Sequence, residues 1–228
     1  MDSTTHSSTE SAAFSPPNVM KDFYERNWSD PRTYARGDKL ADTRRRMLWD
    51  WARQYNVQPK ALLDVGSGEG ALVADAQARG LHATGMDIAE AAARRERARH
   101  PDCTFVVNAI EDRPWPFDPE AFDIVASFEV IEHLVRSADL IKGVYEVLRS
   151  GGYLALTTPY HGVAKNVAIA AYGYENHYRV EGGHIRFFTD PGLIKLIESN
   201  GFSVRELAHI GRRWPLWKCS YVWAQKPR

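Results

Sequence analysis

The sequence is poor in cysteine, in net charge and in long apolar runs, and each of these shortages excludes a class of protein. Its 228 residues include only two cysteines, Cys103 and Cys219, which form no CxxC pair. A disulfide framework or a cysteine zinc site is therefore not expected, and a reducing, cytoplasmic location fits. Basic and acidic residues both total 29. Proteins that hold nucleic acid mainly through its phosphates usually carry a basic excess, so nucleic acid is not an expected partner.

The sequence also lacks a membrane span and a targeting segment. No apolar run approaches the roughly 20 residues that cross a bilayer. The N-terminus is rich in serine and threonine and has no lysine or arginine before Lys21, unlike secretory signals and mitochondrial transit peptides. We expect a disordered tail over residues 1–18 and a single domain over residues 19–228, because this length supports one well-buried core.

What the sequence does contain is an alternation of short apolar segments and amphipathic ones. Strands are predicted over residues 61–66, 82–87, 103–108, 122–127, 152–158, 202–210 and 220–225. Helices are predicted over residues 38–56, 70–80, 88–100, 137–152 and 189–201, with Ser137 and Asp190 as caps of the last two. This pattern predicts an α/β fold with a doubly wound parallel sheet covered on both faces.

The segment 159–189 is long, rich in glycine, tyrosine and histidine, and has few cations. It follows the fifth predicted strand. Because ligands of open α/β sheets bind at the carboxyl ends of the strands, we interpret this insertion as a lid or substrate wall.

A glycine-rich turn follows the first predicted strand, in LLDVGSGEG. Gly66, Gly68 and Gly70 let the backbone and the helix amides approach a ligand closely. The spacing G-x-G-x-G behind Asp64 differs from the dinucleotide fingerprint, and no P-loop for ATP is present. Asp87 ends the second strand, where a carboxylate can accept hydrogen bonds from both ribose hydroxyls or cap the next helix. The turn therefore predicts a nucleoside-containing ligand.

Together these residues resemble the class I S-adenosylmethionine-dependent methyltransferases over essentially residues 20–228. The matching parts are LLDVGSGEG, the acid of GMDI, NAIEDRPWPFDPEAFDIV and LRSGGYLALTTP. One departure is Asn108, where the family commonly has aspartate; either residue can contact adenine. The resemblance implies a seven-stranded, Rossmann-like sheet whose last strand is antiparallel, with S-adenosylmethionine as cofactor.

The resemblance also implies which residues hold the cofactor. Gly66 and its neighbours would hold the methionine part, Asp87 the ribose, and Asn108 with Ala109 the adenine. The residues expected at the cofactor are Arg46, Asp64, Gly66, Ser67, Gly68, Asp87, Ile88, Asn108, Ala109, Ile110 and Phe128. In the ubiquinone-pathway O-methyltransferases, which the chain resembles most, a helical arginine binds the cofactor carboxylate; Arg46 fits best, with Arg44 and Arg45 as rivals.

The stretch FEVIEHL, residues 128–134, follows the fourth predicted strand. It places Glu129, Glu132 and His133 at spacings that share one face of a helix. Two carboxylates beside an imidazole repel each other unless protons, water or a cation separates them. His133 can serve as a general base for an acceptor hydroxyl, or the three residues can bind a divalent cation, Mg²⁺ or a transition metal, that acidifies it. A purely structural role also stays open.

The motif is similar to the E-x-x-E-H of the ubiquinone-pathway O-methyltransferases and of the small-RNA 2′-O-methyltransferases, in both of which it binds a divalent metal. In the RNA enzymes a later histidine completes the site, and the similar stretch GGHIRFFTDPGL maps it onto His184. The resemblance therefore implies catalytic and metal-binding roles for Glu129, Glu132, His133 and His184.

Three functions stay open. The preferred one is methyl transfer to a hydroxyl of a small molecule, a phenol, catechol or polyol. RNA 2′-O-methylation is disfavoured by the zero net charge and by the few cations of the lid. A non-catalytic S-adenosylmethionine-binding protein is disfavoured by the intact glycine turn and motif. No oligomeric state is indicated.

Overall fold

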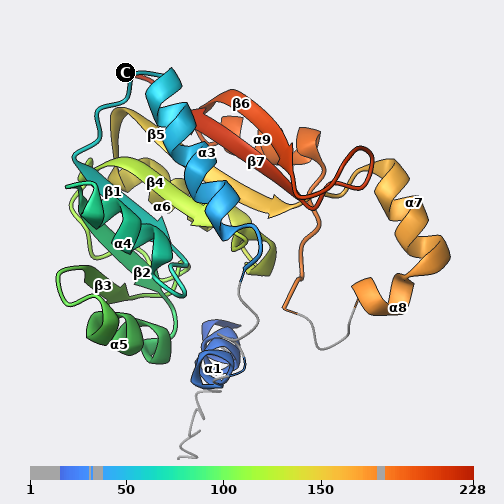
Figure 1. Ribbon diagram of the computed structural model, residues 1–228, viewed down its shortest axis with the longest axis horizontal. Coiled ribbons are helices and arrows are strands. Elements are labelled where there is room, and N and C mark those ends of the chain that lie inside the picture. The colour runs from blue at the N-terminus through green and yellow to red at the C-terminus, as the bar shows by residue number, and fades with distance from the viewer. Residues whose placement is uncertain (1–15, 31, 33–37, 179–182) are drawn as a thin grey trace, which may run out of the picture.

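The computed structural model describes residues 16–30, 32, 38–178 and 183–228 (Figure 1). The part of the predicted tail that precedes Pro16 lies outside the described residues. The chain then enters the helix α1 (Pro16–Ser29). None of the described helices is long and apolar enough to cross a membrane.

A seven-stranded sheet with the order β3-β2-β1-β4-β5-β7-β6 forms the centre of the molecule. The strands are β1 (Ala61–Val65), β2 (His82–Asp87), β3 (Thr104–Val107), β4 (Phe122–Phe128), β5 (Leu148–Pro159), β6 (Ser203–Ile210) and β7 (Cys219–Gln225). All neighbouring pairs are parallel except β5 with β7 and β6 with β7, which are antiparallel. The predicted α/β class, strand number and antiparallel last strand are confirmed.

Helices cover both faces of this sheet, because successive strand residues point to opposite sides. Leu63 packs into the core beneath α6 (Ser137–Val147) and α9 (Asp190–Glu198). Leu62 packs into the opposite core, which Leu48 and Val73 help to form. The helices on that side are α3 (Ala41–Gln54), α4 (Ala71–Ala78) and α5 (Glu90–Arg99).

Three predicted helix boundaries are wrong. The cap of α6 is Arg136 rather than Ser137, which is the first helical residue. The helix expected over residues 137–152 ends at Val147, because the next residues join the sheet: Leu148 already pairs with Phe122 of β4. At the start of α9 the cap is Thr189 rather than Asp190. The Thr189 hydroxyl accepts a hydrogen bond from the Gly192 amide, so Asp190 becomes the first helical residue.

The insertion after β5 contains the helices α7 (Val163–Tyr172) and α8 (Tyr174–His177), which extend sideways from the sheet in Figure 1. The chain returns to the body at Gly183, and residues 179–182 lie outside the described part. The role of this segment as a lid stays a prediction.

Candidate functional site

A cavity of about 390 Å³ opens at the carboxyl ends of β1, β2 and β4. Its roof comes from α1, which contributes Met20, Tyr24 and Trp28. Glu25, on the same helix, accepts a hydrogen bond from the Ala91 amide at the start of α5 (3.0 Å). This contact holds α1 across the mouth of the cavity, which Tyr24 and Trp28 line.

The glycine turn forms the floor of the cavity. The amides of Gly66 and Ser67 donate to the Met86 carbonyl (2.7 and 3.1 Å), which fastens the turn to β2. Gly66 has φ +78°, and a Cβ there would lie 2.4 Å from Val130 Cγ2. At Gly68, with φ +46°, a Cβ would meet the Trp28 ring at 2.9 Å. Both positions therefore require glycine, and the bare backbone faces the cavity.

Asp87 is buried at the end of β2, with both carboxylate oxygens engaged by backbone amides. Gly68 donates to Oδ2 and Ala89 donates to Oδ1, each at 3.0 Å. Burial raises the pKa of Asp87, and these amides act in the opposite direction. Each oxygen keeps a free lone pair, so the carboxylate can accept two further hydrogen bonds from the cavity, as a ribose diol would supply.

Asp64 is the second buried carboxylate of the cavity. Burial, with the charge of Asp87 as the smaller cause, raises its pKa to about 7. A cationic group in the cavity would favour the ionised form of this carboxylate.

Asn108 lies where an adenine edge is expected. Its side-chain amide group donates to the carbonyls of Ala109 (2.7 Å) and Asp112 (3.1 Å). With both N–H groups used, the group left for a ligand is the Oδ1 acceptor, which matches an exocyclic amine.

Most of the residues expected at the cofactor line this one cavity. They are Asp64, Gly66, Ser67, Gly68, Asp87, Ile88, Asn108, Ile110 and Phe128. Ala109 is buried beside it and is not part of the lining.

Arg46, expected as the partner of the cofactor carboxylate, is not among the residues that line this cavity. Arg44 and Arg45 line the cavity, and Arg45 also lines a separate groove that holds Arg46, Trp49 and Arg53. Consecutive helical residues are about 100° apart, so residues two positions apart on α3 face nearly opposite sides. The sequence shows three adjacent arginines, and only the packing of α3 on the sheet decides which of them line the cavity.

Arg44 is buried and joins several elements. Its guanidinium contacts Asp38 and the Cys219 thiol, and Nη2 lies 3.3 Å from Glu129 Oε1. Burial, reinforced by Glu129, raises the pKa of Cys219 to about 12. No sequence motif marks Asp38 or Cys219, because they come from segments far apart in the chain.

The segment after β4 is not the helix that the E-x-x-E-H spacing predicts. Glu129 has φ +57°, and only Ile131–His133 form a 3-10 helix, η1. The left-handed residue breaks the common face, and the Glu129 side chain turns toward Arg44. The predicted four-residue set is therefore assembled only in part.

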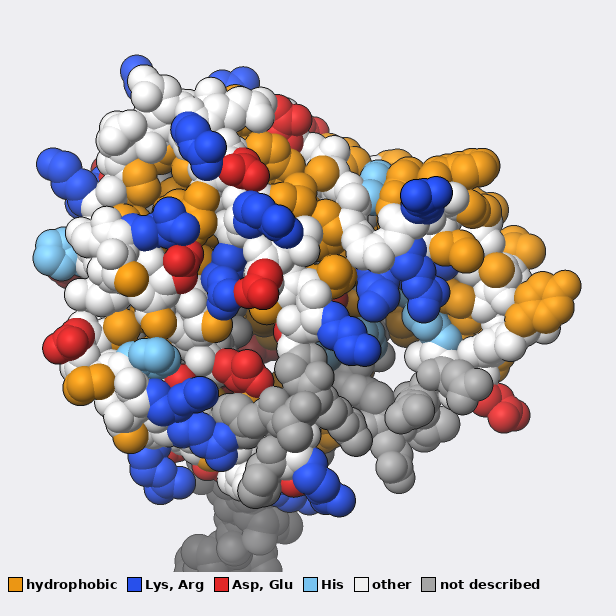
Figure 2. Space-filling view, viewed as in Figure 1, with side chains coloured by type: hydrophobic (Ala, Val, Ile, Leu, Met, Phe, Trp, Pro, Cys, Tyr) orange, Lys and Arg blue, Asp and Glu red, His pale blue; other side chains and the backbone are white. Residues whose placement is uncertain are grey.

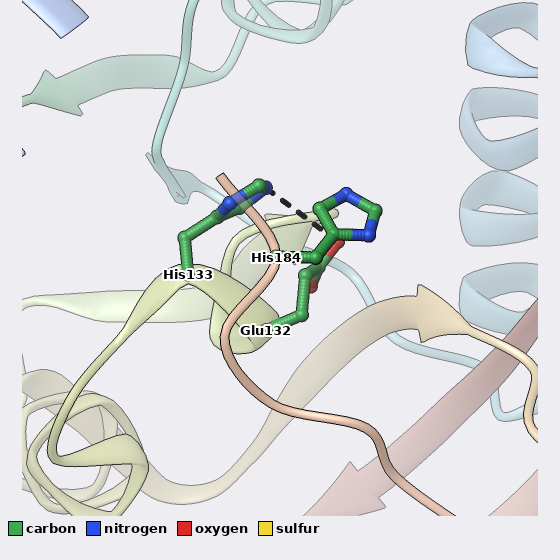
Figure 3. A group of neighbouring side chains, drawn as sticks. All are labelled: Glu132, His133 and His184. Carbon is green, nitrogen blue, oxygen red and sulfur yellow. Dashed lines mark ion pairs between the residues drawn. The ribbon is translucent and has the colours of Figure 1, made fainter. Parts of the chain in front are cut away.

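Glu132, His133 and His184 do come together. Their potential ligand atoms all lie within 4.8 Å of one another, and the three side chains converge in Figure 3. Both the Ile185 and the Arg186 amides donate to the Glu132 carbonyl (3.0 and 2.9 Å), which fixes the segment carrying His184 over η1. The predicted place of His184 beside Glu132 and His133 agrees with this geometry.

Glu132 is the buried member of this cluster. Its Oε2 accepts from the Thr158 hydroxyl (3.1 Å), while Oε1 has no hydrogen-bond partner among the described residues. Burial, followed by the charge of Glu129, raises the pKa of Glu132 to about 8. A cation or a proton at Oε1 would satisfy this group.

His133 is neutral and has a defined tautomer. Burial lowers its pKa to about 4. Its Nδ1 lies 2.7 Å from the Gly183 carbonyl, which can only accept, so Nδ1 carries the proton. The basic nitrogen is then Nε2, which lies 3.8 Å from Glu132 Oε1. Such a fixed imidazole can bind a metal or accept a proton.

The sequence model of a family described as "Methyltransferase domain" matches residues 32–207. A "Probable S-adenosylmethionine-dependent methyltransferase" of Mycolicibacterium smegmatis is 30% identical over 168 residues, covering 68% of this chain and 60% of that protein. A ubiquinone biosynthesis O-methyltransferase of Paramagnetospirillum magneticum is 30% identical over 179 residues, covering 75% of this chain and 72% of that protein.

Solved structures share the fold. Magnesium protoporphyrin IX methyltransferase of Synechocystis PCC 6803, solved with bound S-adenosylhomocysteine, has a TM-score of 0.70 at 15% identity, covering 92% of this chain and 99% of that chain. At this identity the likeness concerns the arrangement of strands and helices.

Proposed function

Because this chain belongs to the class I S-adenosylmethionine-dependent methyltransferases, we propose that it transfers a methyl group to a hydroxyl oxygen of a small molecule such as a phenol, catechol or polyol. The observation that carries the proposal is the cluster of Glu132, His133 and His184 beside the cavity. A hydroxyl becomes a good nucleophile only when its proton is removed, and these groups can remove or displace it. Relatives named as ubiquinone biosynthesis O-methyltransferases support oxygen as the acceptor atom.

The first cavity fits S-adenosylmethionine. Its volume of about 390 Å³ lies within the range of roughly 300–1,000 Å³ typical of small-molecule sites. Asp87 would accept the ribose hydroxyls, Asn108 the adenine amine, and Asp64 would face the ammonium group. Arg45, or Arg44, takes the place of Arg46 as partner of the cofactor carboxylate. When bound, the cofactor supplies an electrophilic methyl group.

Glu132, His133 and His184 fit a divalent cation. One carboxylate and two imidazoles suit Mn²⁺, Fe²⁺, Co²⁺ or Zn²⁺ better than Mg²⁺. The unpartnered Glu132 Oε1 and the His133 Nε2 are the atoms that would bind first. Held there, such a cation would lower the pKa of an acceptor hydroxyl and orient it.

Proton removal by His133 alone is the competing mechanism. The pKa of His133, lowered to about 4 by burial, makes its Nε2 a weak base at neutral pH, because general bases work best with a pKa near the working pH. The same neutral imidazole is the form that binds metals. The buried histidine therefore favours the metal-assisted mechanism.

Metal removal tests this mechanism. After dialysis against EDTA we expect methylation to be lost and to return with Mn²⁺, Zn²⁺ or Mg²⁺, while the Kd for S-adenosylhomocysteine, measured by calorimetry, stays within about 2-fold because the cofactor groups are untouched. Glu132→Gln and His184→Ala should likewise lose methylation and keep cofactor binding. His82→Ala, an exposed histidine at the start of β2, is the matched control and should keep full activity.

Two results would overturn the metal-assisted mechanism. If the metal-free enzyme keeps its full kcat while His133→Ala is inactive, His133 is the general base. If both keep their rate, the cluster is structural and the acceptor needs no help in losing its proton.

A further inference from the structure

A second cavity, of about 680 Å³, adjoins the first. The two share Asp38, Arg44 and Glu129, so a molecule in the second cavity reaches the wall of the first. Its other walls come from the residues before α3, from α7, and from the loop between β6 and β7. A cavity that meets the proposed cofactor site from the side is the natural place for the acceptor.

The walls of this second cavity carry an excess of positive charge. The cations are Lys39, Arg44, Lys165, Arg212 and Lys218, against the two carboxylates of Asp38 and Glu129. Both carboxylates are already paired with Arg44. Within the part of the chain that the structure describes, the other four cations form no ion pair with a carboxylate within 4.0 Å. Their charge is left for a ligand.

This concentration of cations could not be seen in the sequence. The segment 159–189 contributes Lys165 alone to it, and the others come from before α3 and from the loop after β6. Figure 2 shows lysine and arginine side chains gathered between the body and the apolar surface of the α7–α8 segment. Ile169, Tyr172 and Trp217 also line the cavity, which gives it an apolar and aromatic wall beside the charged one.

Lys165 is the best placed of these cations. It is half-buried on α7, and its Nζ donates to the Tyr160 carbonyl (2.7 Å), which leaves further N–H groups free. Burial lowers its pKa, and the neighbouring charge of Arg212 acts in the same direction, while Cys219 and Glu129 oppose them. An anion in the cavity would replace the hydration that this ammonium group has lost.

We propose that the methyl acceptor carries an anionic group, a carboxylate or a phosphate, on an apolar or aromatic body, and that Lys165, with Arg212 and Lys218, binds this group in the second cavity. The inference rests on the proposed function, because it names the class of substrate for that reaction. The apolar wall holds the body, and the hydroxyl points to the boundary with the first cavity.

Binding separates this inference from the proposed chemistry, because it needs no turnover. Dihydroxyphenylacetate, its neutral methyl ester and dihydroxybenzylphosphonate are titrated by calorimetry into protein saturated with S-adenosylhomocysteine. We expect an anionic probe to bind at least ~10-fold more tightly than the ester, as charge-assisted hydrogen bonds to a desolvated ammonium require. Tighter binding of the acid identifies a carboxylate site, and tighter binding of the phosphonate identifies a phosphate site.

Variants locate the anion. Lys165→Met should weaken binding of the preferred anion by on the order of 10- to 100-fold and leave the Kd of the ester and of S-adenosylhomocysteine unchanged. Lys165→Arg should restore part of the affinity, and Lys142→Met, an exposed lysine of α6, should behave as wild type. Equal affinities for the anions and the ester, or anion binding that survives Lys165→Met, would overturn the inference. Anion binding that depends on Lys165 without any methylation would uphold the site and count against the proposed function instead.

Discussion

Two buried carboxylates, Asp64 and Asp87, line the first cavity, and they differ in the hydrogen bonds that offset the cost of burying their charge. Asp87 receives two backbone amides. No hydrogen bond to the Asp64 carboxylate is formed within the described residues, and burial is the larger cause of its raised pKa. Asp87 is therefore ready to bind hydroxyl donors, whereas Asp64 responds to charge in the cavity.

Asp87→Ala should weaken S-adenosylhomocysteine binding by about 2 kcal/mol or more, a rise in Kd of roughly 30-fold, because two charge-assisted hydrogen bonds to the ribose are lost. Calorimetry measures the change. Glu90→Ala removes a nearby exposed carboxylate that does not line the cavity, so its Kd should equal that of wild type. Wild-type affinity of Asp87→Ala, or measurable binding of NAD, would contradict the cofactor assignment.

Asp64 makes stability depend on pH in the apo protein. Its pKa is about 7 in the folded chain against 3.8 as the ordinary value, so between these values the folded chain holds a proton that the unfolded chain has released. The free energy of unfolding should therefore fall as pH rises from about 5 to about 7, by on the order of 3 kcal/mol. Urea unfolding from pH 5 to 8.5 measures this loss.

Asp64→Asn should remove this component of the pH dependence, while Asp102→Asn, in an exposed turn, should keep the wild-type profile. If wild type and Asp64→Asn show the same change in the free energy of unfolding between pH 5 and 8.5, Asp64 is ionised in the folded state and this account of it is wrong.

At the scale of elements, the cavity depends on how α3 and η1 are turned relative to the sheet. The phase of α3 places Arg44 and Arg45 in the lining of the first cavity and Arg46 outside it. The left-handed backbone of Glu129 turns its side chain away from Glu132 and His133, so that its carboxylate forms an ion pair with Arg44. Both features determine which side chains line the cavity, and neither can be recognised from a sequence motif.

The phase of α3 gives a matched pair of variants. Arg45→Ala should raise the Kd for S-adenosylhomocysteine about 10-fold, because a charge-assisted contact to the cofactor carboxylate is lost. Arg46→Ala removes an arginine that does not line the cavity and should leave the Kd, measured by calorimetry, unchanged. If Arg46→Ala raises the Kd and Arg45→Ala does not, Arg46 is the partner of the cofactor carboxylate. If neither variant changes the Kd, Arg44 or backbone amides bind that carboxylate.

The strands and the glycine turn could be predicted from sequence because local patterns determine them: β1 is short and apolar, and Gly66 and Gly68 occupy backbone that excludes a side chain. The face of α3 that points to the cavity could not be predicted, because it depends on how the helix packs against the sheet. Nor could the conformation of Glu129, because a positive φ at a glutamate leaves no mark in composition. The charge of the second cavity arises from segments that only the fold brings together.

At the scale of the whole molecule, the sheet brings two different cavities to one boundary. The first has buried carboxylates and a glycine floor, and the second has cations and an aromatic wall. Asp38, Arg44 and Glu129 form the boundary, and the Glu132 cluster lies beside it through His133. This arrangement suits transfer from a cofactor on one side to a small acceptor on the other.

The central claim is that the methyl group reaches a hydroxyl oxygen of a small molecule. The most direct measurement incubates the protein with S-adenosylmethionine carrying an isotope-labelled methyl group, together with a pool of phenols, catechols, polyols and hydroxy acids and a separate pool of small RNA. Mass spectrometry with fragmentation then locates the label. We predict a labelled methyl ether on a small hydroxylated compound and none on RNA. Label found only on RNA ribose, or on nitrogen or carbon of a small molecule, would contradict the account.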